Sequence, residues 1–152
     1  DKIKTDYEKL QKSEILKDKK KRPFSLRGKI DAYVDHDGFF SIIDFKVTDI
    51  DEKKIELYKT QLLSYAVMFE KPNEKGLKLS PIKNLGIFCF EPNKIQSIDN
   101  KPSFDMKTQY YPIQRDDEYL LNFITEIIDF LEGPKPDFDK NCGLCNLKKS
   151  KF

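Results

Sequence analysis

The sequence has few cysteines, no long apolar run and almost no net charge, and each lack narrows the class of protein. Three cysteines, an odd number, do not suit the disulfide framework of a small secreted domain, so we expect a reducing, cytoplasmic compartment. No apolar run approaches the roughly 20 residues of a membrane span and no signal-peptide pattern is present, so we expect no membrane partner. The net charge is only +2, which does not by itself argue for nucleic-acid binding.

The chain is long enough for one domain with its own core. It has 152 residues, with no internal repeat and no low-complexity tract. We expect the domain to span residues 1–133, because Gly133-Pro134 ends the last helical pattern, and we expect an irregular tail over 134–152. The sequence begins at Asp1 without Met, which leads us to expect an upstream segment.

Hydrophobic periodicity predicts the element order α-β-β-α-β-β-α. The predicted elements are a charged amphipathic helix over 5–20, strands over 26–34 and 41–47, a helix over 51–69, a buried strand over 83–91 ended by Pro92, a strand over 108–113 and a helix over 116–131. Residues 94–107 are expected to form a loop or weak strand. The apolar residues of the last helix are expected to face the core, namely Tyr119, Leu120, Phe123, Ile124, Ile127, Ile128 and Leu131. This string favours the α/β (α+β) class, with a mixed central sheet flanked by helices.

The most informative stretch is Ser41-Ile42-Ile43-Asp44-Phe45-Lys46-Val47. On a strand, Asp44 and Lys46 share one face and the apolar residues between them share the other. A carboxylate beside a fixed positive charge is what metal-assisted phosphodiester cleavage requires: a hard oxygen ligand for a divalent cation, and a cation near the reacting phosphate.

Two further signals stand close to this pair. Asp31 ends Gly28-Lys29-Ile30-Asp31, and the Asp37-Gly38 hairpin signal lies between Asp31 and Asp44. A turn there makes the flanking strands antiparallel neighbours, so both carboxylates could share one metal, although sequence alone does not set the register. Downstream, Gln61 and Tyr65 lie four residues apart on one face of the predicted helix.

In this order and spacing, Gly28-x-x-Asp31, Ile43-Asp44-Phe45-Lys46 and Gln61-x-x-x-Tyr65 resemble the PD-(D/E)XK nuclease superfamily. The RecB-like exonuclease branch, with its CRISPR-associated relatives, is the most similar. The resemblance implies a restriction-endonuclease-like core and Mg²⁺ or Mn²⁺ held by Asp31, Asp44 and the backbone carbonyl of Phe45. It also implies that Lys46 activates the attacking water or stabilises the transition state, and that Gln61 and Tyr65 orient Lys46 or the nucleic acid.

This chain departs from the RecB-like pattern in its upstream ligand. Many members carry a metal-binding histidine on an early helix, whereas the only histidine here is His36, in the predicted turn. Glu8 or Glu14, on the predicted first helix, is the candidate replacement.

Basic residues before the first strand are candidates for phosphate contacts, namely Lys20, Lys21, Arg22 and Arg27. An ordinary solvated helix face is the competing interpretation. The tail carries Cys142-Gly143-Leu144-Cys145, similar to the end of RecB-like proteins that hold an iron–sulfur cluster. Such clusters and zinc sites need about four ligands. Since the third cysteine, Cys89, falls in a predicted core strand, we expect no complete cluster within this chain.

The sequence therefore predicts a metal-dependent deoxyribonuclease, acting on single strands or duplex ends of DNA, alone or within a recombination, replication or CRISPR assembly. Two alternatives remain open. One is a non-catalytic nucleic-acid-binding module on a degenerate nuclease fold. The other is a restriction-type endonuclease of the same superfamily.

Overall fold

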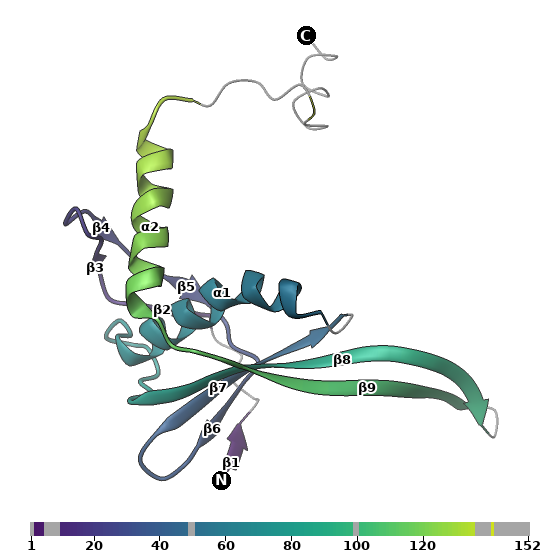
Figure 1. The fold of residues 1–152 in the computed structure, drawn as a ribbon. Helices are drawn as coiled ribbons and strands as arrows, with labels where there is room; N and C mark the ends of the chain where they lie inside the picture. The colour runs from purple at the N-terminus through teal and green to yellow at the C-terminus, as the bar shows by residue number, and fades with distance from the viewer. Residues whose placement is uncertain (1, 5–9, 49–50, 99–100, 136–140, 142–152) are drawn as a thin grey trace.

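The fold is built on one mixed sheet. The computed structural model describes residues 2–4, 10–48, 51–98, 101–135 and 141. Five strands lie in the order β1 (Lys2–Lys4), β6 (Ala32–Asp35), β7 (Phe40–Val47), β8 (Ile82–Ile98) and β9 (Lys101–Ile113). Helices α1 (Glu52–Glu70) and α2 (Asp117–Glu132) follow β7 and β9 (Figure 1). The predicted class, a mixed central sheet flanked by helices, is confirmed.

The predicted hairpin joins β6 to β7. These strands are antiparallel, with Ala32 opposite Ile43. Asp37 and Gly38 both adopt positive φ, 53° and 136°, the backbone conformation for which Asp-Gly turns are favoured. His36 lies in this turn and its Nε2 hydrogen-bonds Ser41 Oγ at 2.8 Å, so it serves the hairpin.

Helix α1 forms the crossover between the parallel strands β7 and β8 and covers one face of the sheet. Ile42 and Ile87, from these strands, and Leu62 and Ala66, from the helix, are fully buried together in the core. The helix predicted over 51–69 is thus confirmed to within a residue. Within the described residues, no helix is long and apolar enough to cross a membrane.

The helix predicted over 5–20 is wrong for its described part, residues 10–20; residues 5–9 lie outside the described ranges. Four short strands replace it, β2 (Gln11–Lys12), β3 (Leu16–Lys17), β4 (Pro23–Phe24) and β5 (Arg27–Gly28), with β2 paired to β5 and β3 to β4. Gln11 and Ser13 of this segment are buried, and backbone groups elsewhere in the chain are their hydrogen-bond partners. Gln11 exchanges two hydrogen bonds with the Leu77 main chain, and Ser13 Oγ accepts from Leu26 N. These tertiary bonds outweigh the apolar periodicity.

Pro92 does not end β8, contrary to expectation. The strand continues to Ile98, with an irregularity between Pro92 and Lys94, and pairs with β9 throughout. A proline is tolerated there because it sits at the irregularity, where a ladder hydrogen bond is already lost. Of the two alternatives expected for residues 94–107, a loop or a weak strand, the described residues therefore form strand.

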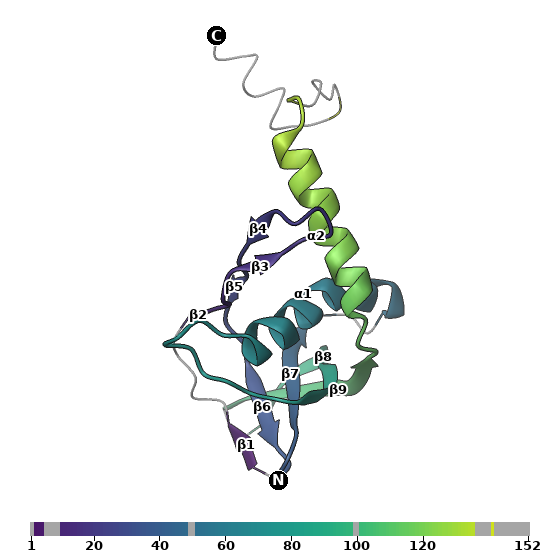
Figure 2. The same cartoon turned by 90° about the vertical axis from the view of Figure 1, so that its left-hand side faces the viewer.

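Helix α2 forms as predicted, with Asp116 accepting a hydrogen bond from Tyr119 N as N-cap. The expected burial is confirmed for Leu120, and Ile124 packs partly buried against the core, but it is wrong for Tyr119, Phe123, Ile127 and Leu131, which are 36–73 % exposed. Figures 1 and 2 show the reason, because α2 rises past the sheet with only the β3–β4 hairpin beside it.

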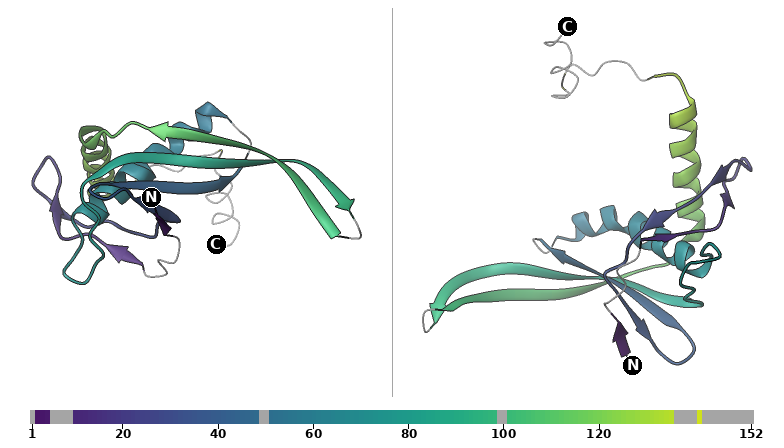
Figure 3. Two further views of the ribbon diagram at one scale, coloured as in Figure 1. Left: turned by 90° about the horizontal axis from the view of Figure 1, so that it is seen from below. Right: turned by 180° about the vertical axis from the view of Figure 1, so that it is seen from behind.

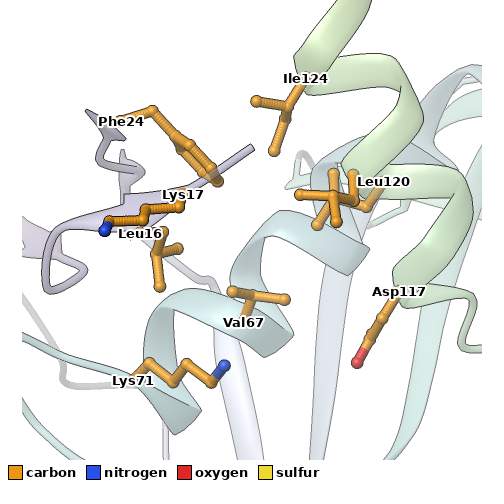
Figure 4. A pocket seen from close by; sticks show the side chains of 9 residues that line it. Leu16, Lys17, Phe24, Val67, Lys71, Asp117, Leu120 and Ile124 are labelled. Atoms are coloured by element: carbon orange, nitrogen blue, oxygen red, sulfur yellow. The ribbon is translucent and has the colours of Figure 1, made fainter. Parts of the chain in front are cut away.

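That hairpin holds the acidic side of α2 through ion pairs. Lys20 Nζ lies 2.7 Å from Asp129, and Arg22 contacts Asp129 at 2.9 Å and Glu132 at 2.7 Å. Beneath these pairs lies a pocket of about 220 Å³, lined by Leu16, Phe24, Val67 and Leu120 among others (Figure 4). The apolar contact of α2 with the body is thus limited to its first two turns.

Arg115 fastens the end of α1 to the starts of β8 and α2. Its guanidinium lies 2.6 Å from Glu70 and 2.8 Å from Asp117, and donates to the Ile82 carbonyl at 3.0 Å. Glu70 also accepts from Ile82 N at 2.8 Å. Burial works to raise the pKa of Glu70, but the hydrogen bonds from Arg115 and Ile82 outweigh it and lower that pKa below its ordinary value.

We expect Glu70→Gln to lower the unfolding free energy by about 1.5–3 kcal/mol at neutral pH, because hydrogen bonds to a charged group are weakened or lost. A carboxylate whose pKa is lowered by folding stabilises the fold above its unfolded pKa, and this contribution disappears as the pH falls through the folded pKa. The difference between wild type and variant should therefore be full at pH 7 and shrink below 4.5. Urea unfolding at pH 7, 5 and 3 measures it.

The control is Glu74→Gln, an exposed carboxylate without an ion pair in the described part of the chain, for which we expect almost no change. A stability loss in Glu70→Gln that stays constant from pH 7 to pH 3 would contradict the charge-based account of this clamp.

Candidate active site

Strand β7 presents Asp44 and Lys46 on the sheet face that α1 covers. Asp44 pairs in register with Ile87, and Lys46 with Cys89, both fully buried. Asp44 itself is buried, whereas Phe45, on the opposite face, is 40 % exposed. The predicted alternation is confirmed. A simple core strand points its apolar residues inward, whereas in β7 the Asp44–Lys46 pair points inward and Phe45 points outward.

Asp31 joins this pair from the neighbouring strand. It immediately precedes β6, and its Oδ2 accepts a hydrogen bond from Phe45 N at 2.9 Å. The β6–β7 register, with Ala32 opposite Ile43, sets Asp31 beside Asp44. The structure therefore brings together the two carboxylates that the hairpin suggested.

Neighbouring charges change the pKa values of Asp44 and Lys46. Burial raises the pKa of Asp44, and the negative charge of Asp31 raises it further, against the opposing effect of Lys46. Lys46 Nζ lies 2.6 Å from Asp44 Oδ2. Burial works to lower the pKa of Lys46, but Asp44 and Asp31 outweigh it and raise that pKa, so Lys46 is a fixed cation at neutral pH.

The oxygen ligands fit a hard divalent cation. Asp44 Oδ2 is buried and accepts no hydrogen bond in the described structure, although the Lys46 ammonium is near. Asp31 keeps a second oxygen beyond the one bonded to Phe45. The described residues contain no cluster of three or more His, Cys, Asp and Glu that could hold a metal, so water or the Phe45 carbonyl would complete the coordination. Mg²⁺ accepts such a set, because it keeps several waters.

Gln61 and Tyr65 lie together on α1. Gln61 Nε2 donates to Tyr65 OH at 2.7 Å, and the described contacts of these two side chains do not include Lys46. Tyr65 instead packs against Gly28 of β5, where a Cβ would stand only 2.9 Å from Tyr65 Cε1. This close contact explains why the Gly28-x-x-Asp31 motif begins with glycine, since a larger residue would push Tyr65 away.

Tyr58 is the residue that sequence reasoning missed. Lys46 Nζ lies 4.9 Å from the centroid of the Tyr58 ring, so the ammonium is held between this ring and the Asp44 carboxylate. In the sequence, Tyr58 falls on the apolar side of the helical pattern over 51–69, which by itself favours a place in the core. Its place one turn before Gln61, on the same helix face, was the available signal.

Other predicted residues lie elsewhere. Lys20 and Arg22 are engaged with α2 carboxylates, whereas Lys21 and Arg27 are exposed. Glu14 donates its backbone N–H to Lys71 O, just past the end of α1, about 20 Å along the helix from Tyr58. Glu14 is therefore not brought to Asp31 and Asp44. The calls on Glu8, Cys142 and Cys145 fall outside the described residues.

Comparison with known proteins agrees with this geometry. The family model of the PD-(D/E)XK nuclease superfamily matches residues 3–150, so the chain belongs to this superfamily. Membership indicates a nuclease, a hydrolase that acts on nucleic acid, and members typically use divalent metals. No curated protein and no solved structure matches the chain.

Proposed function

We propose that this protein is a metal-dependent deoxyribonuclease of the RecB-like branch, which hydrolyses phosphodiester bonds as an exonuclease. Asp31 and Asp44 hold Mg²⁺ or Mn²⁺, with the Phe45 carbonyl as a third ligand. The bound metal supplies Lewis acidity at the phosphate and activates a water for attack. Lys21 and Arg27 add phosphate contacts from the exposed side of the N-terminal strands.

Lys46 provides the fixed positive charge of the site. Its ammonium is aligned before substrate arrives, between Asp44 and the Tyr58 ring, so no reorganisation is needed when negative charge develops on the phosphate. Gln61 and Tyr65, bonded to each other, orient the nucleic-acid backbone from α1.

One observation carries the proposal: the buried Asp44 lies beside a second carboxylate, Asp31, and the described residues place one ammonium, that of Lys46, against the pair. Two neighbouring carboxylates with one ammonium leave a net negative charge, which a hard divalent cation would balance. A purely structural Asp44–Lys46 pair would not need Asp31 next to it, since the second negative charge destabilises the first.

The test is cleavage of end-labelled single-stranded and double-stranded DNA with Mn²⁺, Mg²⁺ or EDTA. Progressive shortening that requires a metal is expected, and the ladder gives its polarity. Binding without cleavage in any metal would replace the proposal by a non-catalytic module, an alternative favoured by the two-carboxylate ligand set of the described residues. Discrete fragments from a long duplex would indicate a restriction-type endonuclease.

A prediction concerns Tyr58. We expect Tyr58→Leu to lower the cleavage rate about five- to thirtyfold, because loss of about 1–2 kcal/mol of cation–π attraction lets Lys46 leave its position. Tyr58→Phe keeps the ring face and should retain most of the rate. Comparing kcat and KM of both variants, with thermal melting as a folding check, separates positioning from stability. Equal rate losses in the Leu and Phe variants would contradict this role.

A further inference from the structure

Strands β8 and β9 run far beyond the sheet that positions the site. Pairing of β7 with β8 ends at Val47 and Phe90, and the outer part of β8 pairs only with β9. Figures 1 and 3 show this two-stranded ribbon projecting from the body. We call residues 91–98 and 101–109 the ribbon. Most of its described side chains are exposed.

On β9, one face of the ribbon is polar, because side chains alternate between faces along the strand. Ile113 and Tyr111, at the inner end, pack against the core. The same face then changes character abruptly, and its next positions on β9 are Gln109, Lys107, Asp105, Ser103 and Lys101. Thr108 and Met106 lie on the opposite face. A polar face of this length has no core to cover and is free to bind a polar partner.

This polar face begins in the row of the sheet that holds Lys46. Lys46 pairs with Cys89, and Cys89 with Gln109, so the three side chains share one face. Two strand spacings separate Lys46 from Gln109, roughly 10 Å. The small Cys89, fully buried, is all that lies between them in that row. The polar face therefore begins two strands from Lys46, on the same side of the sheet, and leads away from the candidate active site.

Three exposed lysines follow along this face. Lys107 is the next residue after Gln109 on this face of β9. Lys94 pairs with Asp105, and Lys101 is the first residue of β9, at the outer end of the ribbon. At 3.3 Å per residue the three lysines span about 20 Å. None has an ion pair in the described part of the chain, although Glu91 and Asp105 share the face, so its net charge is +1. Lysines interleaved with Gln and Ser side chains suit the phosphates and sugars of a nucleic-acid strand.

We infer that the polar face of the ribbon is the track along which the phosphodiester backbone of the substrate strand passes to or from the Asp44–Lys46 site. This inference rests on the proposed function and extends it. The contacts would be to the backbone, so they would be independent of sequence and sensitive to salt. The opposite, more apolar face takes no part in this track.

The test measures binding separately from cleavage. Fluorescent single-stranded and duplex oligonucleotides are titrated in Ca²⁺ over a range of salt, using Lys46→Met protein so that no cleavage occurs. The test variant adds Lys94→Gln, Lys101→Gln and Lys107→Gln. Its matched control adds Lys12→Gln, Lys75→Gln and Lys78→Gln, which remove the same charge from exposed positions at the other end of α1.

We expect the ribbon variant to reduce the salt slope of single-strand binding by about 2, since each lysine released from a phosphate contributes about 0.7, and to weaken binding more than tenfold at low salt. The control should change affinity less than twofold. Gln109→Lys, which adds a cation in the row of Lys46, should tighten binding. Equal effects in the ribbon variant and its control, or no binding by the parent protein, would overturn the track.

Cleavage by the corresponding variants with Lys46 intact separates the two proposals. A protein that binds through the ribbon but cleaves in no metal would refute the nuclease and leave the track standing. A metal-dependent nuclease whose affinity and rate ignore the ribbon lysines would refute the track alone.

Discussion

Asp44→Asn is expected to lower metal-dependent cleavage by well over 100-fold, because residues that only support a metal ligand already contribute about 10–100-fold. The amide keeps the shape of the carboxylate but removes the negative charge that a hard divalent cation requires. Cleavage of end-labelled DNA in Mn²⁺ measures the loss.

The same substitution should not damage the fold. The pKa of Asp44 is raised by burial and by Asp31, so ionising this carboxylate opposes folding at neutral pH despite Lys46. The neutral amide escapes that cost, and we expect the melting temperature in EDTA to be equal or a few degrees higher, at about 2–4 °C per kcal/mol. Because its pKa is raised, Asp44 no longer opposes folding once it is protonated. The stability advantage of Asp44→Asn over the wild type should therefore fade as the pH falls.

Metal binding provides an independent readout. A cation present at 100 times its Kd should stabilise the wild type by about 2.7 kcal/mol, and this shift should be absent from Asp44→Asn. Asp37→Asn is the matched control, because this exposed turn residue has positive φ, which asparagine tolerates. An Asp44→Asn protein that cleaves or gains stability with Mn²⁺ like the wild type would remove Asp44 from the site.

Lys46→Met is expected to lower cleavage about 100- to 1,000-fold while leaving metal binding intact or tighter. The rate falls because a preorganised charge next to the developing charge is lost. Metal binding persists because Lys46 is not a ligand and its ammonium, 2.6 Å from Asp44 Oδ2, competes for the same oxygen. Methionine keeps the length and the apolar stem of lysine, so packing changes little.

Cleavage rates and Mn²⁺-dependent melting shifts on the same samples check this prediction. Lys83→Met is the control. Lys83 is an exposed lysine on β8, and its ammonium also lies over an aromatic ring, that of Phe39. Loss of both cleavage and metal stabilisation in Lys46→Met would mean that Lys46 maintains the ligand geometry and does not act on the phosphate.

The local pattern of the site could be predicted from sequence because it depends on short-range geometry. Period-two alternation put Asp44 and Lys46 on one face, the Asp37-Gly38 turn brought Asp31 alongside, and helical spacing joined Gln61 to Tyr65. The roles given to these residues remain predictions. The division into one domain, residues 1–133, and an irregular tail, residues 134–152, also stays a prediction.

Tyr58 could not be assigned in this way, because a ring on the apolar side of an amphipathic helix suits the core equally well. Only the packing of α1 on β7 brings its face to the Lys46 ammonium. The polar face of the ribbon could likewise not be predicted from a segment expected to be a loop or weak strand, since its faces exist only once β8 and β9 pair.

The sequence by itself determined the central hairpin, the helix that follows it and the placement of Asp44 and Lys46 on one strand face, because each depends on residues close together in the chain. Tertiary structure decided the rest. Long-range hydrogen bonds of Gln11 and Ser13 replaced an expected helix by strands, and α2 kept much of its apolar side exposed because the described body packs against its first two turns alone. Burial and neighbouring charge, which no local pattern encodes, raise the pKa of Asp44.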